Sequence, residues 1–202
     1  EKCLSAKYIH VENDGSYSSY TVDKTRYIFF EHSNGYTDWK NNFDFPSKAY
    51  KGMDIPWRCH RGFLKVWKSI IPYLEKILRN MDFDSCVIVG YSHGAALSAL
   101  CFEYVWFNYP DLRDDIYGFS FGSPRIFYGK RNYEILSERF TKYINVINSD
   151  DIVTKVPPHF LGFRHMGKNL YIGKDKRFMS VNAHRPESYK NSLKEIRCIV
   201  DI

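Results

Sequence analysis

The feature that most restricts the fold of this chain is a serine between two glycines where a predicted strand meets a predicted helix. Residues 87–100 read VIVGYSHGAALSAL, in which a β-branched run leads into Gly90, Ser92 and Gly94 and then into small, helix-favouring residues. A sharp turn crowds the backbone of its middle residue, and flanking glycines remove the Cβ atoms that would clash. Gly-x-Ser-x-Gly arises by chance in roughly one chain in fifteen of this length, so the setting carries more weight than the pattern. It predicts either a nucleophilic Ser92 on a strained turn or a tight turn without chemistry.

The segments around this junction alternate in a way that is typical of an α/β protein. Early runs rich in Tyr, Val, Ile, Thr and Phe predict a strand meander over 6–12, 18–23 and 26–32. The apolar periodicity and turn residues then predict helix 62–81 with a kink or break at Pro72, strand 85–91, helix 93–108, strand 115–121, helix 130–140, strand 142–147, strands 169–172 and 177–182, and a helix from about 185. We therefore expect a mostly parallel central sheet with helices on both faces, in a single domain over 1–202.

The composition excludes several classes of protein. The net charge of +6 comes from Lys and Arg spread along the chain, which favours a solvated surface with at most weak attraction to anionic surfaces. No motif indicates nucleic-acid binding. No apolar run reaches the roughly 18 residues of a transmembrane helix, and no signal segment follows Glu1. We expect a soluble protein, cytoplasmic or secreted after processing, and leave its oligomeric state open.

The five cysteines indicate no structural zinc site. They form no Cys-x-x-Cys pair, and Cys86 and Cys101 fall in the predicted strand and helix, where a core position is expected. Cys3, Cys59 and Cys198 remain candidates for a disulfide in some combination, although the odd total favours a reduced protein. We expect no metal and no cofactor.

A nucleophilic serine needs a base and an orienting acid, and these are sought downstream. In α/β-hydrolases the chain order is Ser, acid, His. His93, His159, His165 and His184 follow Ser92, and the side chain of His93 should point away from its neighbour. His159 and His165 lie in the loop after strand 142–147, whereas His184 lies in the turn before the last helix, from which a histidine can reach back over the strand ends. Asp150 and Asp151 directly follow strand 142–147. The acid and the base expected for Ser92 therefore both lie at predicted C-terminal strand ends, where parallel α/β sheets bind their ligands. The alternatives are a solvated turn for the aspartates and a helix cap for His184.

Several segments in the same order resemble the class 3, or fungal-type, triacylglycerol lipases of the α/β-hydrolase superfamily. The segments are CHRGF at 59–63, the serine turn at 90–94, FGSPR at 121–125, NSDDIVTKVPP at 148–158, GFRHMG at 162–167 and the region of His184 and Tyr189. The resemblance implies that Asp151 rather than Asp150 is the acid, because the family's aspartate precedes Ile-Val. It also implies that His165 is structural and that His184 is the base.

The resemblance extends upstream to two further candidate residues. Phe30-Glu31-His32-Ser33, with Trp39 six residues after Ser33, occupies the place of the family's Phe-Arg-Gly-Ser/Thr segment. Ser33 and the N–H of His93 are thus implied as the oxyanion hole, unless Ser33 merely starts the turn at Asn34. Residues 34–44, with Trp39, take the place of the family's lid, unless Trp39 only packs the loop.

The resemblance implies a serine carboxylester hydrolase that acts on acylglycerols or other carboxylic esters, with lipid degradation as its biological setting. Its partners would be a lipid or small ester and, transiently, a lipid interface. The sequence departs from the family at Glu31 and His32, at Tyr91, where His is usual, and at Ala95, where Gly is frequent. These departures keep two alternatives open: a lipase-fold binding protein with weak or no turnover, and an acyltransferase.

Overall fold

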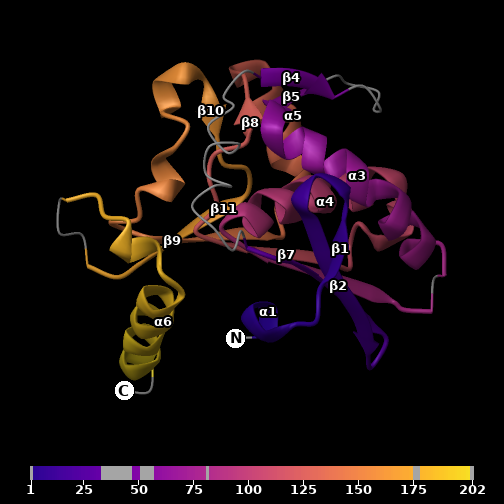
Figure 1. The fold of residues 1–202 in the computed structure, drawn as a ribbon, viewed down its shortest axis with the longest axis horizontal. Coiled ribbons are helices and arrows are strands. Elements are labelled where there is room, and N and C mark those ends of the chain that lie inside the picture. The colour runs from indigo at the N-terminus through magenta and orange to yellow at the C-terminus, as the bar shows by residue number, and fades with distance from the viewer. Residues whose placement is uncertain (1, 33–46, 51–56, 81, 175–177, 201–202) are drawn as a thin grey trace.

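The computed structural model describes residues 2–32, 47–50, 57–80, 82–174 and 178–200, and it is built on a seven-stranded sheet (Figure 1). Its first three strands form an antiparallel meander, and the other four run parallel to the third. In spatial order the strands are β1 (Ile9–Val11), β2 (Gly15–Val22), β3 (Thr25–Phe30), β6 (Ser85–Tyr91), β7 (Ile116–Phe121), β9 (Tyr143–Asn148) and β11 (Lys168–Ile172). The predicted meander and the mostly parallel α/β sheet are confirmed.

The helices lie on both faces of this sheet. One face is covered by α3 (Arg61–Leu78) and α4 (His93–Asn108), while α1 (Lys2–Ser5) and α6 (Pro186–Val200) lie on the other; α5 (Lys130–Arg139) follows β8 (Figure 1). The two faces separate because successive side chains of a strand point in opposite directions. On β6, Cys86 and Ile88 enter the large core beneath α3 and α4, whereas Val89 and Tyr91 join the smaller cluster on the α6 side.

The two long helices differ in burial as their sequences predict. The apolar face of α3 is buried and its opposite face is exposed, as its amphipathic pattern requires. The helix continues through Pro72 without the predicted break, and Pro72 itself is exposed. Every residue of α4 from Gly94 to Val105 is buried, because its small first turn packs tightly against β6 and β7.

A second sheet was not expected from the sequence. Its strands, all paired antiparallel, are β4 (Ser47–Tyr50), β5 (Trp57–His60), β8 (Phe127–Tyr128) and β10 (Phe163–Arg164). These strands have two to four residues each, too few to produce a readable alternation of apolar and polar positions. Cys59, one of the three candidates for a disulfide, lies on β5 as a buried free thiol.

The predicted strand 177–182 is also wrong over the described residues 178–182. Only Ser180 makes a β-bridge there, with Asp151, and Asn182–His184 forms a 3₁₀ turn. The apolar side chains of Phe178, Met179 and Val181 are exposed rather than packed in a core. Among the residues that the structure describes, no strand pairs with this segment beyond that single bridge, so its β propensity is not matched by a partner strand.

The remaining boundaries agree with the sequence predictions to within a few residues, apart from α1, which was not predicted. Asp23 and Lys24, both at positive φ, form the two-residue turn between β2 and β3. Five short 3₁₀ segments occur among the described residues, and three of them are Glu12–Asp14, Pro110–Leu112 and η4 (His159–Leu161). A fourth, Val153–Lys155, follows β9, and η5 (Asn182–His184) precedes α6. No helix among the described residues is long and apolar enough to span a membrane.

Candidate active site

Ser92 occupies a strained turn between β6 and α4. Its φ of 56° and ψ of −118° are rare for a residue with a side chain, and such conformations cost about 1–3 kcal/mol. The flanking glycines make the turn feasible, because a Cβ on Gly90 would overlap the carbonyl of Gly94, and one on Gly94 would overlap the carbonyl of Phe30. The predicted reason for the Gly-x-Ser-x-Gly spacing is therefore visible in the backbone.

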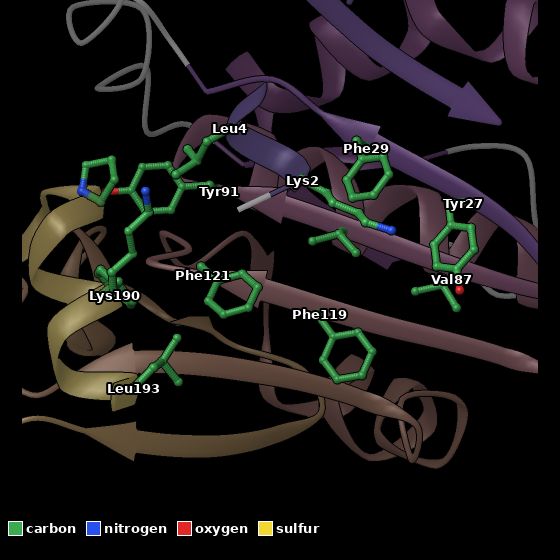
Figure 2. Close-up of a pocket in the computed structure, with 13 residues that line it drawn as sticks. Lys2, Leu4, Tyr27, Phe29, Val87, Tyr91, Phe119, Phe121, Lys190 and Leu193 are labelled. Carbon is green, nitrogen blue, oxygen red and sulfur yellow. The ribbon is translucent and has the colours of Figure 1, made fainter. Parts of the chain in front are cut away.

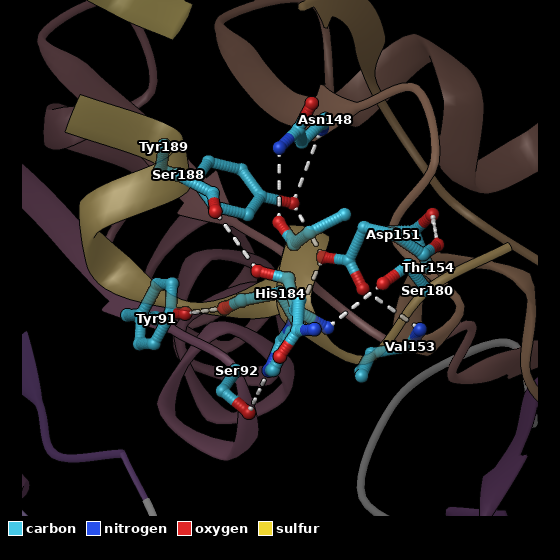
Figure 3. Close-up of polar contacts among 12 residues, drawn as sticks. Tyr91, Ser92, Asn148, Asp151, Val153, Thr154, Ser180, His184, Ser188 and Tyr189 are labelled. Carbon is cyan, nitrogen blue, oxygen red and sulfur yellow. Dashed lines mark hydrogen bonds and ion pairs between the residues drawn. The ribbon is translucent and has the colours of Figure 1, made fainter. Parts of the chain in front are cut away.

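Three side chains distant in sequence meet at the ends of the parallel strands (Figure 3). The Oγ of Ser92 lies 2.8 Å from Nε2 of His184, and Nδ1 of His184 lies 2.7 Å from Oδ2 of Asp151. Ser92 follows β6, Asp151 follows β9, and His184 ends η5 directly before α6. The imidazole thus bridges a hydroxyl and a carboxylate.

The carboxylate of Asp151 is fully buried and accepts three hydrogen bonds. Besides the imidazole, its Oδ2 accepts the hydroxyl of Tyr189 at 2.6 Å, and its Oδ1 accepts the N–H of Val153 at 2.8 Å. Charge-assisted bonds of this kind are about twice as strong as neutral ones, and they offset part of the cost of burying the charge. Because all three partners are donors, the site suits an ionised carboxylate whose oxygens face His184 from a fixed direction.

The imidazole ring of His184 and the backbone of the same residue are both held by Tyr91. The ring of Tyr91 stacks on it with centroids 5.3 Å apart and planes 17° from parallel, and the Tyr91 hydroxyl donates to the His184 carbonyl. Burial and the nearby Asp151 carboxylate raise the pKa of Tyr91, so its hydroxyl stays a donor. Tyr91 is the residue that replaces the family's usual His, and the sequence does not disclose this contact, because the two residues are 93 positions apart.

Gly122 provides the space that the imidazole occupies. It has a φ of 62°, and a Cβ there would lie 2.9 Å from Cε1 of His184 and 3.1 Å from Oδ2 of Asp151. A side chain at this position would push the ring away from its partners. The FGSPR segment was noted only as part of the family resemblance, and this close approach was not foreseen.

A backbone pair joins the loop of the acid to the loop of the base. The N–H of Ser180 donates to the carbonyl of Asp150 at 2.8 Å, beside the bridge between Ser180 and Asp151. The side-chain amide of Asn148 donates to the carbonyl of Ala183 at 2.9 Å. The segment that carries His184 is thereby fixed to the end of β9.

The other candidate histidines lie in different surroundings. Nε2 of His165 is 3.0 Å from the carbonyl oxygen of Thr154, and burial lowers the pKa of His165 to about 4, which keeps the ring neutral. His159 is exposed on η4. The ring of His93 packs edge-on against Phe63, while its backbone N–H belongs to the first turn of α4, where amides point along the axis toward Ser92.

Two predicted site residues cannot be placed. Ser33 and Trp39 lie in 33–46, outside the residues that the structure describes. Within the described part of the chain, no cluster of three or more His, Cys, Asp or Glu side chains could hold a metal ion.

Comparison with known proteins bears on this arrangement. The family model for lipase (class 3) matches residues 27–161. The secreted mono- and diacylglycerol lipase 1 of Fusarium solani is 26% identical over 146 residues, 67% of this chain and 40% of that protein. A lipase of Rhizomucor miehei is 25% identical over 158 residues, 74% of this chain and 42% of that protein. The chain therefore spans about two fifths of the length of these curated relatives.

Solved structures share the fold. The triacylglyceride lipase of Rhizomucor miehei superposes with a TM-score of 0.72 and 21% identity, covering 88% of this chain and 78% of that one. Lipase II of Rhizopus niveus gives a TM-score of 0.71 with 21% identity, covering 82% and 64%. The predicted α/β-hydrolase fold is confirmed by these neighbours.

Proposed function

Because this chain belongs to the class 3 lipase family, we propose that it hydrolyses carboxylic esters of lipids through Ser92, His184 and Asp151. The observation that carries the proposal is the continuous chain of contacts from Oγ to Nε2 at 2.8 Å and from Nδ1 to Oδ2 at 2.7 Å. This geometry supports Ser92 as the nucleophile, His184 as its general base and Asp151 as the acid that orients the base.

In the proposed reaction, Nε2 of His184 takes the hydroxyl proton as Ser92 Oγ attacks the ester carbonyl. The imidazolium that forms is stabilised by the Asp151 carboxylate, and it then returns the proton to the departing alcohol. Water, deprotonated by the same imidazole, next attacks the acyl-enzyme and releases the carboxylic acid. Each cycle consumes one ester and one water and yields one alcohol and one acid.

The oxyanion is proposed to be stabilised first by the N–H of His93. Its place in the first turn of α4, adjacent to Ser92, supports this role. Ser33 remains the second proposed donor on sequence grounds. Loss of one such donor typically costs about 3–4 kcal/mol of barrier.

Exposed apolar side chains beside the site support a lipid or short-chain ester substrate presented at an interface. Phe178, Met179 and Val181 are 81%, 66% and 65% exposed, and they immediately precede the turn that carries His184. A cluster of large exposed apolar residues is typical of a surface that contacts another apolar phase. The same site would therefore meet its ester while this segment touches lipid.

The proposal is tested by labelling with a fluorophosphonate, which reacts only with an activated serine. We expect labelling and p-nitrophenyl butyrate hydrolysis in the parent protein, and neither in Ser92→Ala. Ser137→Ala, on α5 and outside the site, is the matched control and should behave as the parent. Hydrolysis by Ser92→Ala at the parent rate would show that the assignment is wrong.

Two further measurements separate the alternatives. A folded parent protein that is not labelled would favour a binding protein with the lipase fold. Transfer of the acyl group to an added alcohol in preference to water would favour an acyltransferase. A series of acylglycerols and p-nitrophenyl esters of increasing chain length then defines the substrate class.

A further inference from the structure

An apolar trough lies across the face of the central sheet that faces away from α3 and α4 (Figure 2). Its volume is about 380 Å³, within the range of small-molecule sites. The wall on one side comes from α1 and that on the other from α6. The floor consists of side chains from β3, β6 and β7: Tyr27, Phe29, Val87, Val89, Phe119 and Phe121.

The floor is apolar because the strands alternate. Neighbouring residues on the same strands, such as Ile28 and Ile88, enter the core on the other face, so the sheet is apolar on both faces. On the trough side, α1 has only four residues and α6 covers one end, so Val87 and Phe119 remain partly exposed. This surface is separate from Ser92, which is not among the residues that line the trough.

Two lysines give the trough a positive charge. Lys2 extends from α1 over the floor and Lys190 extends from α6 near Tyr91 (Figure 2). Among the described residues, no acidic side chain lines the trough and neither lysine forms an ion pair. An occupant that fits must combine an apolar body with a negative group.

We propose that the trough binds one long-chain fatty acid, with its carboxylate at Lys190 and its chain along Val87, Phe119 and Phe121. The size of the trough supports a single chain. A 150 Å³ apolar cavity holds benzene, so about 380 Å³ scales to roughly 15 carbon atoms.

The trough shares two side chains with the surroundings of Ser92. Tyr91 and Tyr189 line it with their rings, while their hydroxyls hold the carbonyl of His184 and the carboxylate of Asp151. A bound chain would therefore pack against the rings that position the proposed base and acid. If the proposed function holds, this ligand is also the acid that the enzyme releases.

The experiment measures binding of palmitate to the Ser92→Ala protein, by displacement of a fluorescent fatty acid and by calorimetry. We expect one site per chain, and binding of hexadecanol at least fivefold weaker than that of palmitate, because the alcohol lacks the charge. Lys190→Glu should weaken palmitate binding by about five- to tenfold, as expected for a partly exposed ion pair whose sign is reversed. Lys194→Glu, on the same helix but not lining the trough, is the matched control and should bind as the parent.

Leu193→Trp fills the trough and should abolish binding, with circular dichroism and the thermal midpoint showing that the variant is folded. If it does not fold, Lys190→Glu against Lys194→Glu still decides the question. Equal affinity in those two variants would overturn the proposal. So would loss of binding when a hexadecyl fluorophosphonate occupies Ser92 of the parent, which would place the chain at the ester site.

A dimer that Leu193→Trp dissociates, without palmitate binding, would make this face a subunit interface instead. Because Ser92→Ala has no turnover, failure of this proposal and failure of the proposed function are distinguishable.

Discussion

Replacing Asp151 by Asn tests whether its charge is used in the reaction. The imidazole of His184 is neutral before the proton transfer and positive after it, so the carboxylate 2.7 Å away stabilises mainly the charged state. With the two charge centres about 4 Å apart, the interaction is worth about 4 kcal/mol at an effective dielectric constant of 20. Since about 1.4 kcal/mol is a factor of ten, kcat/KM should fall about a thousandfold.

The three donors around residue 151 predict how the new amide will lie. Two donors, from His184 and Tyr189, meet Oδ2, and one, from Val153, meets Oδ1. The amide oxygen should therefore take the Oδ2 side, which preserves the tautomer of His184. The amide nitrogen then faces the Val153 N–H, and because two donors meet there, the free energy of unfolding should fall by about 1–3 kcal/mol. The loss of rate then reports the charge rather than the tautomer.

The assay compares p-nitrophenyl butyrate hydrolysis by purified, folded Asp151→Asn and Asp150→Asn proteins. Asp150→Asn removes the neighbouring carboxylate, which is not the partner of His184 Nδ1, and it should retain activity within tenfold of the parent. A loss below tenfold in Asp151→Asn, or an equal loss in both variants, would refute the electrostatic reasoning.

Three further predictions rest on other contacts. Gly122→Ala should lower kcat/KM about a hundredfold in a folded protein, because a Cβ 2.9 Å from His184 displaces the ring. The control is Gly162→Ala, which is also at positive φ but lies outside the site. Equal activity of the two variants would contradict the prediction. Burial raises the pKa of Glu103 to about 7, above its ordinary 4.5, so the native state binds more protons between these values and stability should fall by on the order of 3 kcal/mol as pH rises through that window. Urea unfolding from pH 4 to 8 should show this decrease of the unfolding free energy with pH, and Glu103→Gln should make the decrease smaller. An unchanged pH dependence in Glu103→Gln would contradict the prediction. Phe178→Ser with Met179→Ser should lower hydrolysis of emulsified long-chain glycerides several-fold and leave soluble short-chain esters unaffected, whereas a parallel loss on both would point to a structural role.

The central sheet and its helices were predictable because their signals are local. The β-branched run before Ser92, the amphipathic face of α3 and the small residues of α4 each identify an element from its own letters. Chain order and the convergence of strand ends predicted that Ser92 and His184 meet one of Asp150 and Asp151, and the resemblance to the lipase family selected Asp151. Their catalytic roles stay a prediction.

The second sheet and the contacts of the tyrosines were not predictable for a different reason. Strands as short as β8 depend on partners from distant parts of the chain and have no pattern of their own. The same applies to Tyr91, whose hydroxyl finds a carbonyl 93 residues away. The apolar run before His184 was misleading, because alternation alone does not distinguish a buried strand from an exposed apolar segment.

The link between Ser180 and the carbonyl of Asp150 has a consequence for how activity is lost on heating. Since it couples two peptide segments at the rim of the sheet, detachment of one should free the other in the same event. Amide exchange at residues 151 and 180 should then share one opening free energy, and inactivation should follow that opening rather than melting of the whole domain.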